Sequence, residues 1–489
     1  ILKALDPEIA REIAKKLFTK PPEEPIFRIN TEMHTAAINS IAVDREWTRF
    51  VVTGSDDKTI RVWDQETGRL LKIIRPPIGD GIDGQITAVA ISPDGDTIAC
   101  GSIAGVWEKT EVMMFFDRES GSLLGTMTGL PASITQIRYA PDGKYLATLG
   151  AEGSGLRIYK TEDYSLSSKD LDYGQEDALG LDWNRNNQII TASLDRSIRL
   201  YQVDENGGIT LEKKLILPDS NRPHSVAFSP DGNQIAIGFF DSPRVDVYTV
   251  PDLTYLFSPD CSQINNGNLP LVAWSRDGEL LYLNAGGRFH LENQVALVRW
   301  SEAGQGPAVA IPVAENTLMS LVSLDDRELI YASNDPAWGK LDSSGIQEVY
   351  HQSPLLDFRA AVEHFSLSSD GRTVEILPYQ ATHPFRFSIT ERRFLDINQS
   401  MTDSHSPLTQ SPGIIVTGWW NEYSPRINGK PVSLKPNERS RSLAISSNGQ
   451  FIVLGTEWYL RCLDRNGNEK WHFRTPGACW GLNISSDNT

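Results

Sequence analysis

The amino-acid sequence predicts an all-β protein built from small antiparallel sheets that repeat along the chain. Apolar and polar residues alternate in short runs such as 38–43 and 59–63, and this period of two is typical of half-buried strands. Polar turns separate the runs. One turn type, Ser-Pro-Asp-Gly and its variants, recurs at roughly 45-residue intervals, with one gap nearly twice as long. The spacing predicts about ten repeats and the first strand of one more.

Composition and charge limit the class of protein. The chain has 489 residues, of which 40% are hydrophobic and 22% are charged, values typical of soluble globular proteins. No apolar run is long enough for a membrane-spanning helix, and the first residues lack a signal-peptide layout, so we expect a cytoplasmic protein. The net charge of −17 argues against general nucleic-acid binding. Four scattered cysteines without C-x-x-C pairs suggest a reducing compartment and no zinc site.

The stretch from residue 34 to 64 is the clearest repeat. It predicts strands at 38–43, 49–53 and 59–63, with a tight hairpin at the turn 55–58. Four side chains in it are suited to one network, in which an imidazole bridges a carboxylate and a hydroxyl and an indole N–H donates to that hydroxyl. We predict that this structural tetrad consists of His34, Thr53, Asp57 and Trp63.

Residues 54–64, GSDDKTIRVWD, resemble the signature half of a WD repeat. The resemblance implies a β-propeller, in which each blade is a four-stranded antiparallel sheet beside a central channel. Because one ring typically holds 4–8 blades, about ten repeats imply tandem propellers. We expect a first propeller of about seven blades at 25–354 and the blades of a second, truncated one at 355–489. In the alternative, later blades return and close the first ring with a strand at 25–30.

Residues 1–24 carry the one clear helical pattern and are predicted to form a linker helix. Asp6 suits the N-cap, Pro7 the first helical position, and Ile9, Ile13 and Leu17 share one face. The chain does not start with Met, and it stops at a turn that resembles those after a first blade strand. We therefore expect a fragment of a longer protein.

The repeats lose their polar signature along the chain. The fourth repeat keeps a partial tetrad of Thr191, Asp195 and Tyr201, with the tyrosine in place of tryptophan, and Asp172 stands where the histidine is expected. Where the signature is incomplete, the resemblance implies the strand pattern and not the network.

Motifs for catalysis are weak. Residues 403–406, DSHS, contain the residue types of a hydrolytic triad, but they lie in a Ser/Thr/Pro-rich stretch that favours a linker. No phosphate-binding glycine loop and no H-E-x-x-H motif occurs, and the eight histidines are spread singly. We therefore predict no catalytic residue, no metal site and no cofactor.

Two hairpins, 102–112 and 286–295, are longer than their equivalents, and rigid scaffolds often carry recognition residues on such loops. Their aromatic residues Trp107 and Phe289 are candidate protein-binding anchors, as are Trp419 and Trp420 in a predicted strand. The alternatives are that the hairpins fold back onto neighbouring sheets and that both tryptophans pack in the core.

The last part of the chain resembles the propeller region of bacterial caspase-like peptidases that carry WD repeats. The matching stretches are 428–431, 438–443, 454–458 and 479–483. In that family a protease domain can be joined to the propellers, but no His-Cys peptidase core is visible here. The resemblance thus implies a context and carries over no catalytic residue.

These observations predict a non-catalytic WD-repeat scaffold that binds a protein or peptide partner. We expect it to be the sensor or regulatory module of a larger multidomain effector, with a covalently linked effector domain, no general nucleic-acid binding and no membrane contact. The alternatives are the regulatory propeller region of a caspase-like peptidase, a hydrolase with its site in a propeller channel, and a spacer for a neighbouring domain.

Overall fold

The computed structural model describes most of the chain. The described residues are 32–44, 49–76, 84–102, 111–130, 132–218, 221–277, 280–291, 294–324, 328–342, 344–352, 365–368, 372–376, 385–391, 393–395, 404–405, 414–417, 422–435, 438–446, 448–475, 479, 482 and 484. The predicted helix at 1–24 lies outside them. The chain divides into two compact units, one of residues 1–78 and 83–353 and one of residues 79–82 and 354–489.

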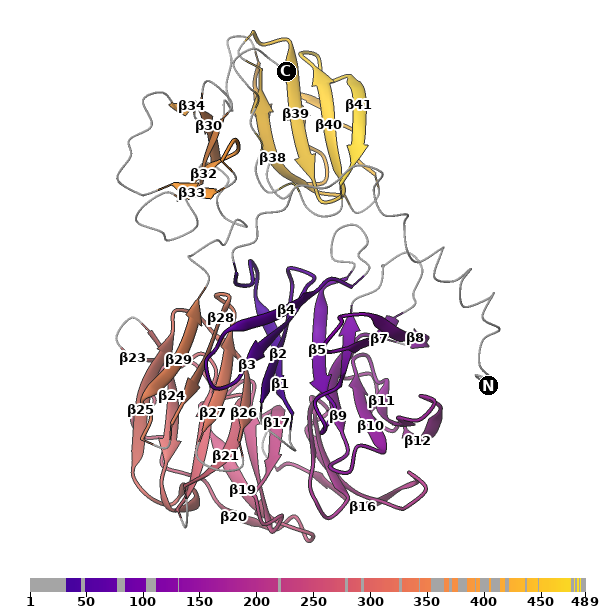
Figure 1. The fold of residues 1–489 in the computed structure, drawn as a ribbon, viewed down its shortest axis with the longest axis vertical. Helices are drawn as coiled ribbons and strands as arrows, with labels where there is room; N and C mark the ends of the chain where they lie inside the picture. The colour runs from indigo at the N-terminus through magenta and orange to yellow at the C-terminus, as the bar shows by residue number, and fades with distance from the viewer. Residues whose placement is uncertain are drawn as a thin grey trace. The chain divides into compact units, whose positions relative to one another are not determined.

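Seven antiparallel sheets make up the described part of the first unit, and each is formed by consecutive strands (Figure 1). Sheet 1 holds β1 (Ile38–Val43), β2 (Phe50–Ser55), β3 (Ile60–Asp64) and β4 (Leu70–Ile74). Sheet 2 holds β5 (Ile86–Ile91), β6 (Thr97–Ser102), β7 (Glu111–Asp117) and β8 (Leu123–Leu130). Sheet 3 holds β9 (Ile134–Tyr139), β10 (Tyr145–Gly150), β11 (Gly155–Lys160) and β12 (Leu166–Asp170). Sheet 4 holds β13 (Ala178–Trp183), β14 (Gln188–Ser193), β15 (Ser197–Val203) and β16 (Ile209–Ile216).

The remaining three sheets of this unit follow the same order. Sheet 5 holds β17 (Pro223–Phe228), β18 (Gln234–Phe239), β19 (Val245–Thr249) and β20 (Tyr255–Phe257). Sheet 6 holds β21 (Leu271–Asp277), β22 (Leu280–Gly286), β24 (Gln294–Trp300) and β25 (Ala308–Ala314), with the short β23 (His290–Leu291) paired to β24. One helical turn, η1 (Glu302–Gly304), precedes β25. Sheet 7 holds β26 (Leu318–Ser323), β27 (Leu329–Ser333), β28 (Ala337–Leu341) and β29 (Gln347–Gln352).

Apolar side chains between the sheets form the core. Because successive residues of a strand point to opposite faces, each sheet has an apolar face for each of its two neighbours. One cluster joins sheets 1 and 2, and equivalent clusters join each following pair of sheets up to sheets 6 and 7. These contacts arrange the sheets in sequence order.

The circuit of sheets is closed. A seventh cluster packs Trp63 and Ile41 of sheet 1 against Trp338 and Ile330 of sheet 7, and β1 contacts both β26 and β27. In Figure 1 these strands lie side by side. A closed circuit of four-stranded antiparallel sheets is a β-propeller, so the predicted fold class is confirmed. Among the described residues, each sheet of this unit pairs only its own strands, and side chains make the contact between sheets 1 and 7. The strand predicted at 25–30 lies outside these residues.

The second unit contains three described sheets. The first has the strand order β33 (Arg393–Leu395), β32 (Phe385–Ser388), β31 (Thr373–Ile376), β30 (Phe365–Ser368) and β34 (Ser404–His405). The second consists of β35 (Val416–Thr417), β36 (Arg426–Ile427) and β37 (Lys430–Pro431). The third consists of β38 (Ser440–Ile445), β39 (Phe451–Thr456), β40 (Tyr459–Asp464) and β41 (Glu469–Arg474), and it shares an apolar cluster with the second. The linker predicted for 403–406 is therefore wrong at β34.

Candidate functional site

The four side chains predicted for the tetrad of sheet 1 meet in one buried network. The indole N–H of Trp63 donates to Thr53 Oγ1 at 2.9 Å, and His34 Nε2 lies 2.6 Å from the same oxygen. His34 Nδ1 lies 2.9 Å from Asp57 Oδ2. Because a carboxylate only accepts, Nδ1–H donates to Asp57, and Nε2 accepts the hydroxyl proton of Thr53. Every polar atom in this chain of contacts has a partner, so the network ties the segment before β1 to β2 and β3.

The charges within the tetrad follow from burial and hydrogen bonding. Burial lowers the pKa of His34, which keeps the imidazole neutral near pH 7. Burial alone raises the pKa of Asp57, but the contacts with His34 and Thr59 outweigh it and hold the pKa below its usual range. The network is thus a neutral imidazole on an ionised carboxylate, an arrangement that fixes structure.

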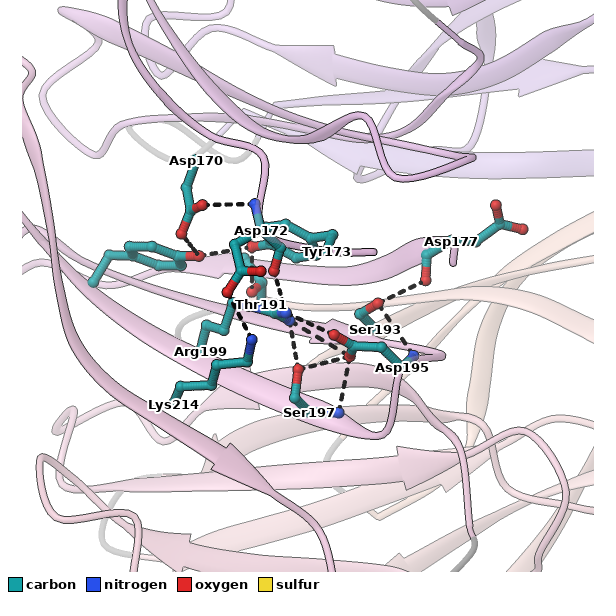
Figure 2. Close-up of polar contacts among 11 residues, drawn as sticks. Asp170, Asp172, Tyr173, Asp177, Thr191, Ser193, Asp195, Ser197, Arg199 and Lys214 are labelled. Carbon is teal, nitrogen blue, oxygen red and sulfur yellow. Dashed lines mark hydrogen bonds and ion pairs between the residues drawn. The ribbon is translucent and has the colours of Figure 1, made fainter. Parts of the chain in front are cut away.

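Sheet 4 builds a different network at the same place (Figure 2). The hydroxyl of Tyr173 lies 2.8 Å from Thr191 Oγ1 and 3.0 Å from the hydroxyl of Tyr201, and Tyr201 donates to Asp170 Oδ2 at 2.9 Å. Burial raises the pKa of Tyr173 to about 12 and raises the pKa of Tyr201 further, so both are neutral phenols. Tyr173 therefore stands in for the histidine of sheet 1.

The expectation that Asp172 occupies the histidine position is wrong. Its side chain is 74% exposed and forms an ion pair with Lys214 at 2.8 Å. The backbone turns at this point, since the N–H of Tyr173 donates to the carbonyl of Leu171 at 2.9 Å. Tyr173 enters the buried network, whereas Asp172 pairs with Lys214, as Figure 2 shows.

Asp195 of the predicted partial tetrad binds an arginine instead of a histidine. Arg199 Nη2 donates to Asp195 Oδ2 at 2.6 Å and to the carbonyl of Asp172 at 2.5 Å, and the guanidinium lies 3.9 Å from the ring centre of Tyr173. Burial raises the pKa of Asp195, but the hydrogen bonds from Arg199 and Ser197 outweigh it and leave the pKa below its usual value. A buried arginine thus links the turn between β14 and β15 to the segment before β13.

A repeated feature that sequence reasoning missed lies near the start of the first strand of most sheets in the first unit. This strand is here called the inner strand, because it contacts the first strands of both neighbouring sheets. The register with the second strand shifts by one residue near the start of six of the seven inner strands. A bulge of this kind leaves one residue outside the ladder and redirects its side chain. The six bulge residues are Asn39, Thr87, Thr135, Leu179, His224 and Met319.

Four of these bulge residues bind the start of the inner strand in the next sheet. Asn39 Nδ2 donates to the carbonyl of Ile86 at 2.9 Å, and Thr87 Oγ1 donates to the carbonyl of Ile134 at 2.7 Å. Thr135 binds the carbonyl of Ala178, and His224 that of Pro270, in the same way. These bonds place the starts of the inner strands of sheets 1 to 4, and likewise of sheets 5 and 6, at one end of the ring, here named the bulge end. Because the strands are antiparallel, the turns between the second and third strands lie at the same end.

Of the four candidate binding aromatics, one lies in the described part of the chain. Phe289 is 4% exposed and packs in the cluster between sheets 5 and 6, so its ring is part of the core and is not an exposed anchor. The hairpin above it is held by Asn266, which bonds the backbone of His290 through Oδ1 at 2.8 Å and Nδ2 at 3.1 Å. Trp107, Trp419 and Trp420 lie outside the described residues.

In the second unit, the first residue of the stretch 438–443 belongs to a buried ion pair. Glu438 is fully buried and accepts from Arg461 Nε at 2.9 Å and Nη2 at 2.7 Å, and it also binds the hydroxyl of Thr456 at 2.5 Å. A two-point contact of this kind holds one geometry. The pair joins the segment before β38 to β39 and β40, so these residues have a structural role.

Groups of three or more His, Cys, Asp or Glu side chains arranged to hold a metal are absent among the described residues. The cysteines in this part of the chain are free thiols, and burial raises the pKa of Cys100 to about 12 and that of Cys261 to about 11. Both thiols are therefore protonated near neutral pH. No described helix has the length and apolar character needed to cross a membrane.

Comparison with known families finds one that matches the sequence of sheets 1 and 2. The model of the WD domain, G-beta repeat (WD40), matches residues 27–64 and 77–106, which include most of sheet 1 and the strands β5 and β6 of sheet 2. The chain contains WD40 repeats. The first match spans all four residues of the buried tetrad.

Three relatives found by sequence similarity are eukaryotic proteins of low identity. Protein HIR1 of Candida albicans is 24% identical over 53% of this chain and 31% of its own length. Pre-mRNA-processing factor 19 homolog 2 of Arabidopsis thaliana is 23% identical over 47% of this chain and 43% of its own length. WD repeat-containing protein VIP3 of the same plant is 23% identical over 37% of this chain and 56% of its own length. The chain thus matches only part of each of these relatives. They do not support a bacterial origin, which the resemblance to bacterial caspase-like peptidases led us to expect.

Proposed function

We propose that this chain is a non-catalytic scaffold for protein–protein interaction and that its partner contacts the bulge end of the first unit. WD-repeat relatives support an interaction role of this general kind. The proposal places the contact where the turns of all seven described sheets come together. The partner is a protein or a peptide, because a rigid ring of turns offers many separate side chains and backbone groups to an extended surface.

The ring closure is the observation that carries this proposal. Hydrogen bonds from the bulge residues to the next sheet, together with the cluster between sheets 1 and 7, hold the turns at fixed positions. A surface that is already ordered loses little conformational freedom when a partner binds. The scaffold therefore presents recognition groups without having to order them first.

A hydrolase with its site in the channel is less well supported. It needs acidic or histidine groups with shifted pKa values that converge on a substrate. The groups described above with shifted pKa values make hydrogen bonds inside their own sheet: His34 contacts Asp57, and Tyr173 contacts Thr191. Their hydrogen-bonding capacity is used by the fold.

The wider context is also part of the proposal. We propose a sensor or regulatory module of a larger cytoplasmic effector, in which a covalently linked domain acts on the bound partner. The resemblance of 428–431 and 454–458 to the propeller region of caspase-like peptidases supports a peptidase as one such domain. Deletion of the propellers separates this role from that of a spacer, because an effector that keeps its regulation without them would contradict it.

Site-specific photo-crosslinking tests where the partner binds. A photoreactive amino acid is placed at Asp172 or Arg196 on the bulge end, or at Glu162 or Glu205 on turns at the opposite end; Asp172, Glu162 and Glu205 are exposed. We expect a defined cross-linked partner in cells from the first pair and not from the second. Equal cross-linking at both ends, or none at either, would contradict the proposed contact surface.

A further inference from the structure

The two faces of the last sheet, formed by β38–β41, differ in exposure. One face shares an apolar cluster with the sheet of β35–β37. On the other face Phe473 is 65% exposed and Trp471 is 49% exposed, and the neighbouring Val453 and Leu460 are partly exposed. These four residues are here named the open face. An apolar patch of this kind is typical of a surface that another element covers.

The open face matches, row by row, a face of sheet 1. Residues paired across antiparallel strands lie on the same face of a sheet. In the last sheet the two rows are Ser442, Gly455, Leu460, Phe473 and Ala444, Val453, Cys462, Trp471. In sheet 1 the same rows are Ser40, Gly54, Ile60, Ile74 and Ala42, Val52, Val62, Lys72. Sheet 2 covers the apolar members of the rows in sheet 1, and Ile74 is only 2% exposed there.

Cys479 lies against this side of the last sheet, at the place where a following sheet would start. A Cβ added to Gly455 would be 2.6 Å from Cys479 Cβ. In sheet 1, a Cβ added to Gly54 would be 2.5 Å from Ile86 Cγ2 of sheet 2. Because Ile86 is the first residue of the inner strand β5, Cys479 occupies the position of a first inner-strand residue.

Hydrogen bonds hold Cys479 at this position. Its carbonyl accepts from Ser442 Oγ, and its N–H donates to the carbonyl of Thr456 at 2.9 Å. The carbonyl of Ile86 likewise accepts from a side chain of the preceding inner strand, Asn39, at 2.9 Å. The last sheet thus binds Cys479 much as sheet 1 binds the start of sheet 2.

The residues after Cys479 have the pattern of an inner strand. Leu482 and Ile484 follow it at the third and fifth positions. In sheet 2 the third and fifth residues after Ile86 belong to the apolar cluster shared with sheet 1. Residues two apart in a strand point to the same side, so this stretch can give one apolar side to the last sheet.

We propose that the open face is the docking face for a further four-stranded sheet of the same polypeptide, with an inner strand that begins at Cys479. The outer strands of that sheet cover Trp471 and Phe473, as sheet 2 covers Ile74. An unrelated partner does not account for Cys479, which already lies where an inner strand starts. This docking face belongs to the second unit and is independent of the contact proposed for the bulge end of the first.

Cysteine labelling tests the docking face. Phe473→Cys is made in the 489-residue chain and in a longer chain that includes the residues encoded after Thr489. A maleimide labels both, and peptide mapping by mass spectrometry follows the rate at position 473. We expect labelling to be slower by about tenfold or more in the longer chain, because a covered thiol reacts slowly. Trp471→Cys, on the same face, should behave in the same way.

His472 supplies the matched control. It lies between the two test positions, its side chain points to the opposite side of β41, and it is 44% exposed. His472→Cys should be labelled at rates that agree within about twofold in the two chains. A loss of folding would instead change the labelling rates at all three positions.

Three results would overturn the proposal. One is equal labelling of Phe473→Cys in the two chains. Another is a reading frame that encodes no three further strands after Thr489. The third is labelling in the 489-residue chain that slows as the protein concentration rises, because a second copy would then cover the open face.

Discussion

The seam between sheets 1 and 7 makes a specific prediction about Gly68. This residue lies in the turn between β3 and β4 with φ +68°, and a Cβ there would come within 2.6 Å of Val349 Cγ1 and also collide with His351 Nε2. His351 cannot move aside freely, because its ring stacks on Trp63 at 5.6 Å and on Trp338 at 5.3 Å. We therefore expect Gly68→Ala to open the seam.

The equivalent turn of sheet 2 supplies the control. Gly121 has φ +74°, and its N–H donates to Asp117 as that of Gly68 donates to Asp64, both at 2.8 Å. A Cβ at Gly121 meets nothing nearer than 3.5 Å. Alanine at either position costs about 1–2 kcal/mol because of the positive φ. At Gly68 the collision adds about 1–3 kcal/mol, for a total of about 2–5 kcal/mol.

Urea unfolding followed by tryptophan fluorescence measures this difference, and hydrogen exchange of β28 and β29 locates it. The double variant Gly68→Ala with His351→Ala should lose less stability than the sum of the single variants, because the second change removes the obstacle to the first. Equal destabilisation by Gly68→Ala and Gly121→Ala would refute the reasoning, since it would show that only backbone strain acts at both turns.

Three further predictions concern the polar network of sheet 4, the last sheet and pH. Tyr173→Phe should lower the free energy of unfolding by about 1–3 kcal/mol, because the buried hydroxyl of Thr191 loses the partner given above. Asp172→Ala on the exposed side should cause no measurable loss in the same urea titration. Ile74→Asp should lower the free energy of unfolding by about 2–5 kcal/mol or more, because Ile74 is 2% exposed and packs between sheets 1 and 2. Phe473 occupies the matching position of β41 and is 65% exposed, so Phe473→Asp should change the free energy of unfolding by no more than about 0.5 kcal/mol. Burial lowers the pKa of His224 to about 4 in the folded chain, against 6.5 in the unfolded chain. Between these two values the unfolded chain binds more protons, so stability falls as the pH falls through this window. The stability of His224→Gln, whose side chain does not titrate there, should fall less steeply.

Each of these has a clear contrary result. A Tyr173→Phe chain as stable as the wild type would show that the hydroxyl contacts contribute nothing. Similar losses for Phe473→Asp and Ile74→Asp would show that the face of β41 is covered in solution. If the stability of His224→Gln fell as steeply with pH as that of the wild type, His224 would not be the group responsible. The lowered pKa values of His34 and His351 would then account for the pH dependence of stability.

The sequence predicts best where all the evidence lies in one continuous stretch. The tetrad of His34, Thr53, Asp57 and Trp63 belongs to one stretch of 34–64, and the predicted first strand 38–43 coincides with β1. The alternation of apolar residues and the residue types of the turn specify both. In this stretch local pattern and final contacts agree.

Prediction failed where a contact depends on another repeat or on an exact register. The choice between Asp172 and Tyr173 depends on one residue of offset before β13, and turn markers do not resolve it. Phe289 is buried because a loop from the preceding repeat holds its hairpin through Asn266. The bulge residues follow from strand pairing, although a polar residue just before the alternation begins, such as Asn39 or Thr87, is a signal that could have indicated them.

The side-chain closure of the ring also bears on how this molecule can change over time. Because each described sheet of the first unit is one uninterrupted run of sequence, a whole sheet can be gained or lost without breaking the backbone ladder of any other. The new neighbours need only match two apolar faces. A lineage of such rings is therefore free to vary its number of modules, and with it the set of turns that it offers to other proteins.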